Sequence, residues 1–385
     1  FLPTNMFWGS TRFSESVSME AYYQLNWRPV ETDPSGTYMS TNDYASLGGR
    51  YLMLAGGTVA SPVINPDLYH DTCIIGKNAA GQTNIANSDK YDDFVATYGL
   101  ATATALLQGS CVAAVPRIED RKARDNGQFG VALRWYAEAL NQTEFGFYAM
   151  NYHSRLPALS GKAVTMPANL VSVSNTAGLI VEYPEDIHLL GVSFNTTVPG
   201  GIAWQGELSY RPNAPFQIDD TELILAALSP NNQALRANGA PASVMFISQL
   251  GEYGSNAYIK GYREHEMLQF QSTFTKAFGN VLGAESIALV GEVGAMQVSL
   301  EDASVLRYEA EGSNGKPTCD VTDIRSAANY PASVLNPANA GCLRNIQTAD
   351  SNIFATDFSW GYRLAAVATY NNIFGLPVNL APRLA

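Results

Sequence analysis

Long and short connections alternate between the predicted strands of this chain, and this alternation limits the folds open to it. Residues 126–155 provide the clearest hairpin: period-two alternation predicts two antiparallel arms, joined by a tight turn around Asn141 and Gln142. Further strands are predicted at 16–28, 187–197, 202–211, 258–276, 286–295 and 358–370, and from 376 onward. Long segments are expected at 30–125, 156–185, 213–256 and 299–352, and short turns at 198–201, 279–283 and 371–375.

Each predicted strand has one apolar and one polar face. In the first arm of the hairpin, Phe129 and Leu133 alternate with Arg134 and Tyr136. Outer-membrane barrels sort their connections in this way, with short periplasmic turns and long extracellular loops. We therefore predict an all-β fold, in which residues 1–385 form one antiparallel transmembrane β-barrel domain that is truncated at one or both ends. The alternative is a large soluble β-sandwich with decorated loops.

Composition favours the barrel and excludes some partners. Charged residues make up only 15% of the chain, while Tyr (20) and Gly (32) are abundant. The formal net charge of −12 argues against a nucleic-acid partner, because phosphate contacts need a basic surface. The uncharged stretch 94–116 is diluted by Thr, Gly, Gln and Ser, so we expect a small loop helix there rather than a membrane span.

Four cysteines lie in two of the long segments, at Cys73, Cys111, Cys319 and Cys342. An even count permits two disulfides in three connectivities, and pairing within each segment would staple two long loops in an oxidising compartment. Free buried thiols are the alternative. The absence of a close Cys pair or Cys/His cluster argues against a metal site at these residues.

Two local features bear on the barrel. Aromatic residues near strand ends, Trp27, Trp135, Tyr210 and Tyr370, suit an interfacial girdle. Residues Asp219–Leu228 predict a short helix capped by Asp220, which would fold inward as a plug or lie on the outer rim.

Several sequence segments resemble one family of proteobacterial proteins, the domain-of-unknown-function family 1302. They include Asn5-Met-Phe-Trp-Gly-Ser and Thr143-Glu-Phe-Gly-Phe-Tyr-Ala-Met-Asn-Tyr-His-Ser-Arg-Leu-Pro. The remaining segments are residues 33–43, 115–121, 127–134, 209–215 and 380–385. The resemblance implies an outer-membrane barrel that accompanies exporters and catabolic pathways for hydrophobic compounds. The function that the resemblance implies is transport, and the family supplies no catalytic residues to carry over.

Polar-face side chains are the candidates for a ligand path through the lumen. They are Arg134, Tyr136, Tyr148, Glu207, Arg211, Arg263, His265 and Glu292. The alternative is that they only fill the interior with salt bridges and hydrogen bonds. The expected partners are the lipid bilayer of the cell outer membrane, a hydrophobic small molecule, and a periplasmic or exporter protein.

Enzymatic and metal chemistry have weaker support in the sequence. His153 and Ser154 are neighbours on a strand, so their side chains point to opposite faces and make a poor dyad. The carboxylate pairs Asp92-Asp93 and Glu301-Asp302 suit solvated loops better than a cation site. We therefore expect no catalytic residues, metal or cofactor. A docking platform for a partner protein is the main alternative function, and a membrane-embedded hydrolase is a further one.

Overall fold

A ten-stranded antiparallel sheet dominates the computed structural model, and its order follows the chain. The structure describes residues 4–34, 37–38, 44–53, 95–97, 99–100, 114–166, 176–239, 245–302, 305–309, 316–317, 346–347 and 355–384. The sheet order is β1 (Met6–Arg12), β2 (Val17–Gln24), β5 (Gln128–Ala137), β6 (Thr143–Tyr152), β9 (Ile187–Val198), β10 (Ile202–Gln217), β12 (Tyr262–Val281), β13 (Ala284–Val298), β16 (Phe358–Thr369) and β17 (Arg383–Leu384).

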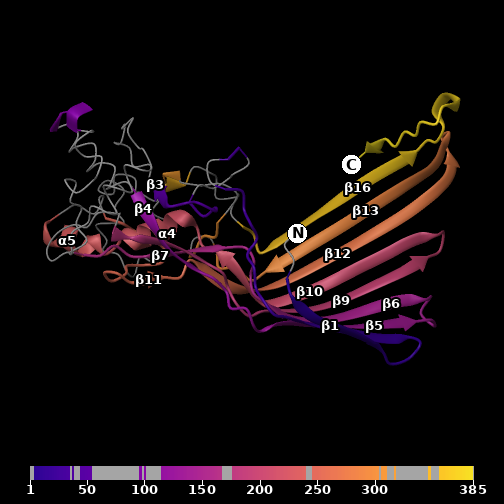
Figure 1. The fold of residues 1–385 in the computed structure, drawn as a ribbon, viewed down its shortest axis with the longest axis horizontal. Coiled ribbons are helices and arrows are strands. Elements are labelled where there is room, and N and C mark those ends of the chain that lie inside the picture. Colours follow the sequence, from indigo (N-terminus) through magenta and orange to yellow (C-terminus); the bar gives the residue numbers. More distant parts are fainter. Residues whose placement is uncertain are drawn as a thin grey trace.

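The predicted alternation of connections is present in the sheet. Short turns join β5 to β6, β9 to β10 and β12 to β13 at one end of the strands, and the long segments emerge at the other end (Figure 1). The turn pairs Asn141-Gln142, Gly200-Gly201 and Leu282-Gly283 all have positive φ, the geometry that lets a tight turn follow the twist of two antiparallel strands. Within the described residues β1 and β17 are the sheet's two edges, so this sheet is open.

The described parts of the long segments fold together into a second unit, which we call the cap. Its mixed sheet has the order β11 (Tyr258–Ile259), β7 (Ala158–Lys162), β8 (Gly178–Glu182), β4 (Ala114–Arg121) and β3 (Tyr51–Met53). The cap also holds α4 (Asp220–Leu228), α5 (Asn231–Ala237) and residues 305–309, and its sheet and helices lie beyond one end of the large sheet (Figure 1). A separate two-stranded pair joins β14 (Lys316–Pro317) to β15 (Ile346–Gln347).

The most deeply buried residues belong to the cap rather than to the large sheet. Val164, Ile218, Ile259 and Val181 have no exposed surface, and α4 packs Leu223 against β7 and β11. The helix spans Asp220–Leu228, and its N-cap is Asp219 rather than the predicted Asp220, because the Asp219 carboxylate accepts hydrogen bonds from the amides of Thr221 and Glu222. The cap core therefore holds α4 in place.

Gln217 fastens the cap to the large sheet at the end of β10. Its side-chain amide donates to the carbonyls of Leu159 (2.9 Å) and Gly261 (2.9 Å), and its side-chain oxygen accepts from the Leu159 amide (2.6 Å). A Cβ on Gly261 would lie 1.7 Å from the carbonyl oxygen of Leu159, so only glycine allows this close approach.

Several expectations need correction. The strand predicted at 16–28 ends at Gln24, and Trp27 is buried against Tyr183 (ring centroids 4.7 Å apart) instead of joining an exposed girdle. The strand predicted from 376 onward is reduced to its far end: after η7 (Ile373–Gly375) the chain meets Tyr370 through an isolated bridge at Leu380 and then forms β17. β1 was not predicted, and neither were β3, β4, β7 and β8 of the cap; the strand predicted at 258–276 is divided between β11 in the cap and β12 in the large sheet.

Other expectations cannot be compared with the fold. Cys73, Cys111, Cys319, Cys342 and the Asp92-Asp93 pair lie outside the described residues. In the described part of the chain, no helix has both the length and the apolar character needed to cross a membrane.

A buried ion pair joins α4 to residues 305–309. The Arg307 guanidinium donates to the Glu222 carboxylate, and both side chains are almost fully buried, at 4% and 0% exposed. The second Glu222 oxygen accepts from the Gln249 amide (2.6 Å). Removal of the cation would leave a carboxylate buried without its partner.

We predict that Arg307→Met destabilises the cap by about 3–5 kcal/mol, so that α4 is cleaved more than about 100-fold faster by a protease that acts on the opened state. The matched control is Arg236→Met, which removes a half-exposed ion pair with Glu252 and should cost at most about 1 kcal/mol. Equal cleavage rates for the two variants would contradict this account.

Candidate functional site

The strand register assigns every side chain of the large sheet to one of two faces. Residues paired across antiparallel strands lie on the same face, so Glu20, Ala132 and Tyr148 share a row, as do Arg134, Gly146 and Ser193. This polar face continues across β10, β12, β13 and β16 through rows that hold Gln205, Glu207, Ser209, Gln269, Gln271, Thr273, Glu292 and Arg363.

Six of the eight predicted path residues lie on this polar face. They are Arg134, Tyr136, Tyr148, Glu207, Arg211 and Glu292. Two further members, Glu20 and Arg363, were not among the candidates, although the alternation of their strands places them on the same face. Arg134 lies 3.3 Å from the Glu20 carboxylate, and Glu292 is directly opposite Arg363 in the register. These pairings could not be read from the sequence, because they depend on which strands are neighbours.

Tyrosine rings cover glycines on the polar face. A Cβ on Gly130 would lie 2.4 Å from the ring of Tyr22, and the Tyr148 ring covers Gly146 in the same way. The Tyr148 hydroxyl also lies within hydrogen-bond distance of Ser193 Oγ (3.0 Å). The rings therefore lie flat along the sheet, so the polar face between them remains open.

Two hollows open on the large sheet along the polar rows. One, of about 290 Å³, is lined mostly by amide, hydroxyl and carboxylate groups: Glu144, Ser193, Asn195, Gln205, Glu207, Gln271 and Thr273. The other, of about 390 Å³, runs across β12, β13 and β16 and includes Glu292, Arg363 and Trp360. Both can accept a solute that offers hydrogen-bonding groups.

The other two predicted path residues lie where residues 299–302 and 305–309 cover the start of β12. His265 is only 9% exposed, its Nε2 lies 2.5 Å from the Tyr308 hydroxyl, and Glu301 is 3.2 Å away. Tyr308 in turn donates to the Glu301 carboxylate. Arg263 contacts the carbonyls of Lys260 and Tyr262. Arg263 and His265 are in phase with the polar-face residues of β12. The segment that covers them separates His265 from the open polar face.

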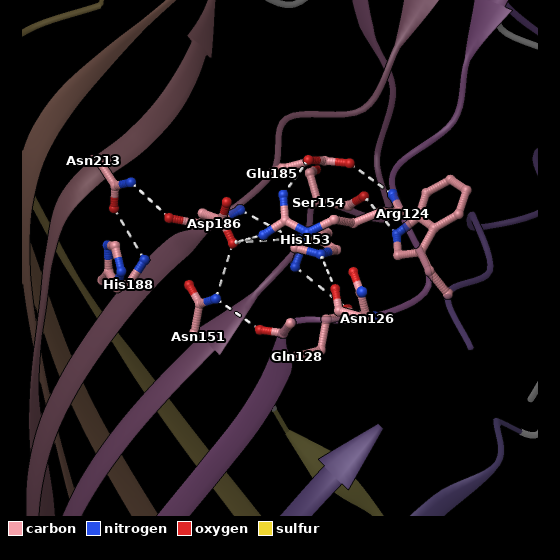
Figure 2. A network of polar contacts seen from close by, with 12 residues as sticks. Arg124, Asn126, Gln128, Asn151, His153, Ser154, Glu185, Asp186, His188 and Asn213 are labelled. Carbon is pink, nitrogen blue, oxygen red and sulfur yellow. Dashed lines mark hydrogen bonds and ion pairs between the residues drawn. The ribbon is translucent and has the colours of Figure 1, made fainter. Parts of the chain in front are cut away.

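A polar network fixes the chain where three strands meet the cap (Figure 2). Arg124 donates to both Glu185 (2.5 Å) and Asp186, and Asn151 donates to Asp186 (3.0 Å). These ion pairs and hydrogen bonds lower the pKa of Asp186, with the Arg124 contact as the main cause. Asp186 has φ of 56°, so the network holds a left-handed backbone conformation that is uncommon for residues other than Gly, although Asn and Asp adopt it more readily than most.

His153 belongs to the same network and is not paired with Ser154. Its Nδ1 accepts from the Asp186 amide (3.0 Å), and its Nε2 contacts the Asn126 carbonyl (2.8 Å). The Ser154 hydroxyl donates to the Leu156 carbonyl instead (2.8 Å). The imidazole thus crosslinks two strand ends, and the arrangement provides no serine nucleophile.

The face opposite the polar face, which we call the apolar face, is not covered by the described residues. Phe129, Leu190, Phe270 and Trp360 are 47%, 55%, 41% and 66% exposed. Aromatic rings form a row across this face near the short turns: Trp135 stacks on Phe145, and Trp204 contacts both Phe194 and Phe274, at centroid distances of 5.5, 4.7 and 5.7 Å. Of the predicted girdle residues, Trp135 and Tyr210 lie on this face by register.

Three carboxyl groups crowd at the start of α4. Oxygens of Asp219, Asp220 and Glu309 all lie within 4.8 Å of one another, a spacing that could hold a metal ion. Burial, together with the neighbouring Glu222 and Asp220, raises the pKa of Asp219 to about 6. Burial and Asp220 raise the pKa of Glu309 to about 8. Helix amides already bond Asp219 and Glu309.

Comparison with known proteins identifies a family for the chain but no characterised relative. The family model described as "Protein of unknown function (DUF1302)" matches residues 1–385. No curated protein and no solved structure matches.

We predict that α4 and residues 305–309 separate more readily as the pH rises from 5 to 9. Asp219 and Glu309 bind protons more tightly in the folded than in the unfolded chain, so their contribution is most favourable in acid and is lost as pH passes about 6 and then about 8. Hydrogen exchange of the α4 amides, corrected for intrinsic rate, would measure this. Glu309→Gln should remove the upper part of the dependence, and a stability of α4 that rises with pH would contradict the prediction.

Proposed function

We propose, from the premise that this chain belongs to the DUF1302 family, that it forms an outer-membrane β-barrel through which hydrophobic small molecules pass. In this proposal hydrocarbon contacts the apolar face of the large sheet, and the polar face lines a lumen. The long segments and the cap lie outside the cell, and the short turns lie in the periplasm.

The uncovered apolar face is the observation that carries the proposal. Water-soluble monomers rarely expose a contiguous apolar surface larger than a few hundred Å². Here such residues recur on nearly every strand from β5 to β16. The set includes Phe129, Val131, Leu133, Phe147, Leu190, Val192, Leu208, Leu268, Phe270, Phe274, Leu289, Trp360 and Leu364, all at least 36% exposed. A lipid bilayer is a solvent that would cover all of them at once.

The height of the apolar face suits a bilayer. On β12 the apolar side chains run from Leu268 to Phe278, ten residues apart, which corresponds to about 33 Å of strand. A strand tilt of about 40° reduces this to about 25 Å, the height of the apolar band of a membrane barrel. Near the short turns Lys276 directs its amine to the Gly200 carbonyl, as a snorkelling lysine does.

The polar face supports passage without a chemical step. Its hollows are lined by amides and hydroxyls with scattered charged groups and, in the larger one, aromatic rings, so a solute would move between weak sites without a covalent intermediate. The cap would form the extracellular entrance. Passive movement along the lumen requires no cofactor.

We predict that the full-length protein accelerates entry of the neutral probe N-phenylnaphthylamine into vesicles whose outer leaflet is lipopolysaccharide. Ser209→Trp, on the polar face, should slow entry several-fold by obstructing the path. Leu208→Trp, its neighbour on the apolar face, should leave the rate unchanged. Equal rates with and without the protein would contradict transport and favour a docking platform.

A further inference from the structure

One row of the polar face is apolar, and it lies next to the cap. The register aligns Tyr22 with Gly130, Gly130 with Met150, and Met150 with Leu189. On the other side Arg211 pairs with Met267, and Met267 pairs with Val298. Tyr210 pairs with Leu190 in the antiparallel register of β10 and β9. The next residue of β10, Arg211, therefore lies level with Leu189, and the two halves of the row are joined. We call this row the apolar belt: Tyr22, Met150, Leu189, Met267 and Val298, with Arg211 as its charged member.

The guanidinium of Arg211 has no acidic partner in the described part of the chain. Its Nε donates to the Tyr152 hydroxyl (3.2 Å), and its Nη1 approaches Met267 Sδ (4.0 Å). Arg134, by contrast, is 3.3 Å from a carboxylate. Glu207, the acid on the same face of β10, is four residues away, or about 13 Å along the strand. Arg211 is therefore a cation set among thioether, aliphatic and aromatic side chains.

The backbone directly after Arg211 is irregular and firmly held. The register of β10 against β12 shifts between Arg211 and Ala214. Within this bulge the Asn213 side chain accepts from the His188 amide (2.9 Å) and donates to the Asp186 carbonyl (2.8 Å), as Figure 2 shows. Bulges of this kind redirect side chains beside binding sites. The network around Asp186 thus fixes the bulge that directly follows Arg211.

We propose that Arg211 binds the carboxylate of an amphipathic acid whose hydrocarbon part lies along the apolar belt. The guanidinium offers a planar fork of N–H donors that matches a carboxylate, and its Nη2 has no partner among the described residues. The methionines beside it can adapt to alkyl or aryl chains of varied shape. This inference rests on the proposed function, because it places the site in the lumen at the entrance to the path.

Equilibrium binding of radiolabelled dodecanoate to the full-length protein in nanodiscs of zwitterionic lipid tests the proposal. Dodecanol and dodecyltrimethylammonium have the same chain and lack the carboxylate. We expect the wild-type protein to bind dodecanoate at least about tenfold more tightly than either analogue. Arg211→Met should abolish this preference, Arg211→Lys should retain part of it, and Arg134→Met should leave it intact.

The proposal is overturned if the wild-type protein shows no preference for dodecanoate, or if Arg211→Met keeps it. If Arg211→Met does not fold, the affinities of Arg211→Gln and Arg211→Lys for dodecanoate are compared instead. Equal affinities of these two variants would overturn the proposal. Binding is measured without transport, so the two ideas separate. If Arg211→Met loses the preference for dodecanoate while entry of N-phenylnaphthylamine is unchanged, the binding site is supported. If the wild-type protein binds dodecanoate tightly but does not accelerate entry of N-phenylnaphthylamine, only the transport proposal is contradicted.

Discussion

The exposed apolar face of the ten-stranded sheet is the constraint on which the rest of this structure depends. Burial of apolar side chains stabilises a protein by about 25 cal/mol per Å², and no layer of the described chain covers this face. The fully buried residues are concentrated in the cap, which the long segments build beyond the strand ends. We proposed membrane insertion because an apolar solvent would cover this face, and the proposed path along the polar face rests on the same observation.

The cap and the large sheet play different physical parts. The cap is stabilised by a buried core and by the Glu222–Arg307 ion pair, as an ordinary soluble domain is. The sheet is stabilised by its ladder of hydrogen bonds and by flat tyrosine–glycine contacts. Gln217 and the network around Asp186 join the two units. These junctions also set the geometry of Arg211, so the entrance to the proposed path is shaped by the cap.

Sequence alternation predicted the large sheet well, because the period of two is a local property that each strand carries by itself. It failed where burial removes the alternation: β8, Gly178–Glu182, is buried at every position and therefore has no polar face to detect. It also failed where a strand pattern continues into the cap, as at Trp27 and His265, whose surroundings come from segments far away in the chain. The polar-face residues were predictable, but the apolar belt was not, because it appears only when seven strands are aligned in register.

Fluorescence quenching by lipids brominated on their acyl chains tests the central claim most directly. The chain has five tryptophans, and variants that keep one at a time would be reconstituted in vesicles. Trp135 and Trp360, on the apolar face and 41% and 66% exposed, should be quenched strongly. Trp27, buried at 6% exposure beside the cap, should not be quenched. Equal quenching of all three, or none at Trp135 and Trp360, would contradict the proposal that hydrocarbon covers this face.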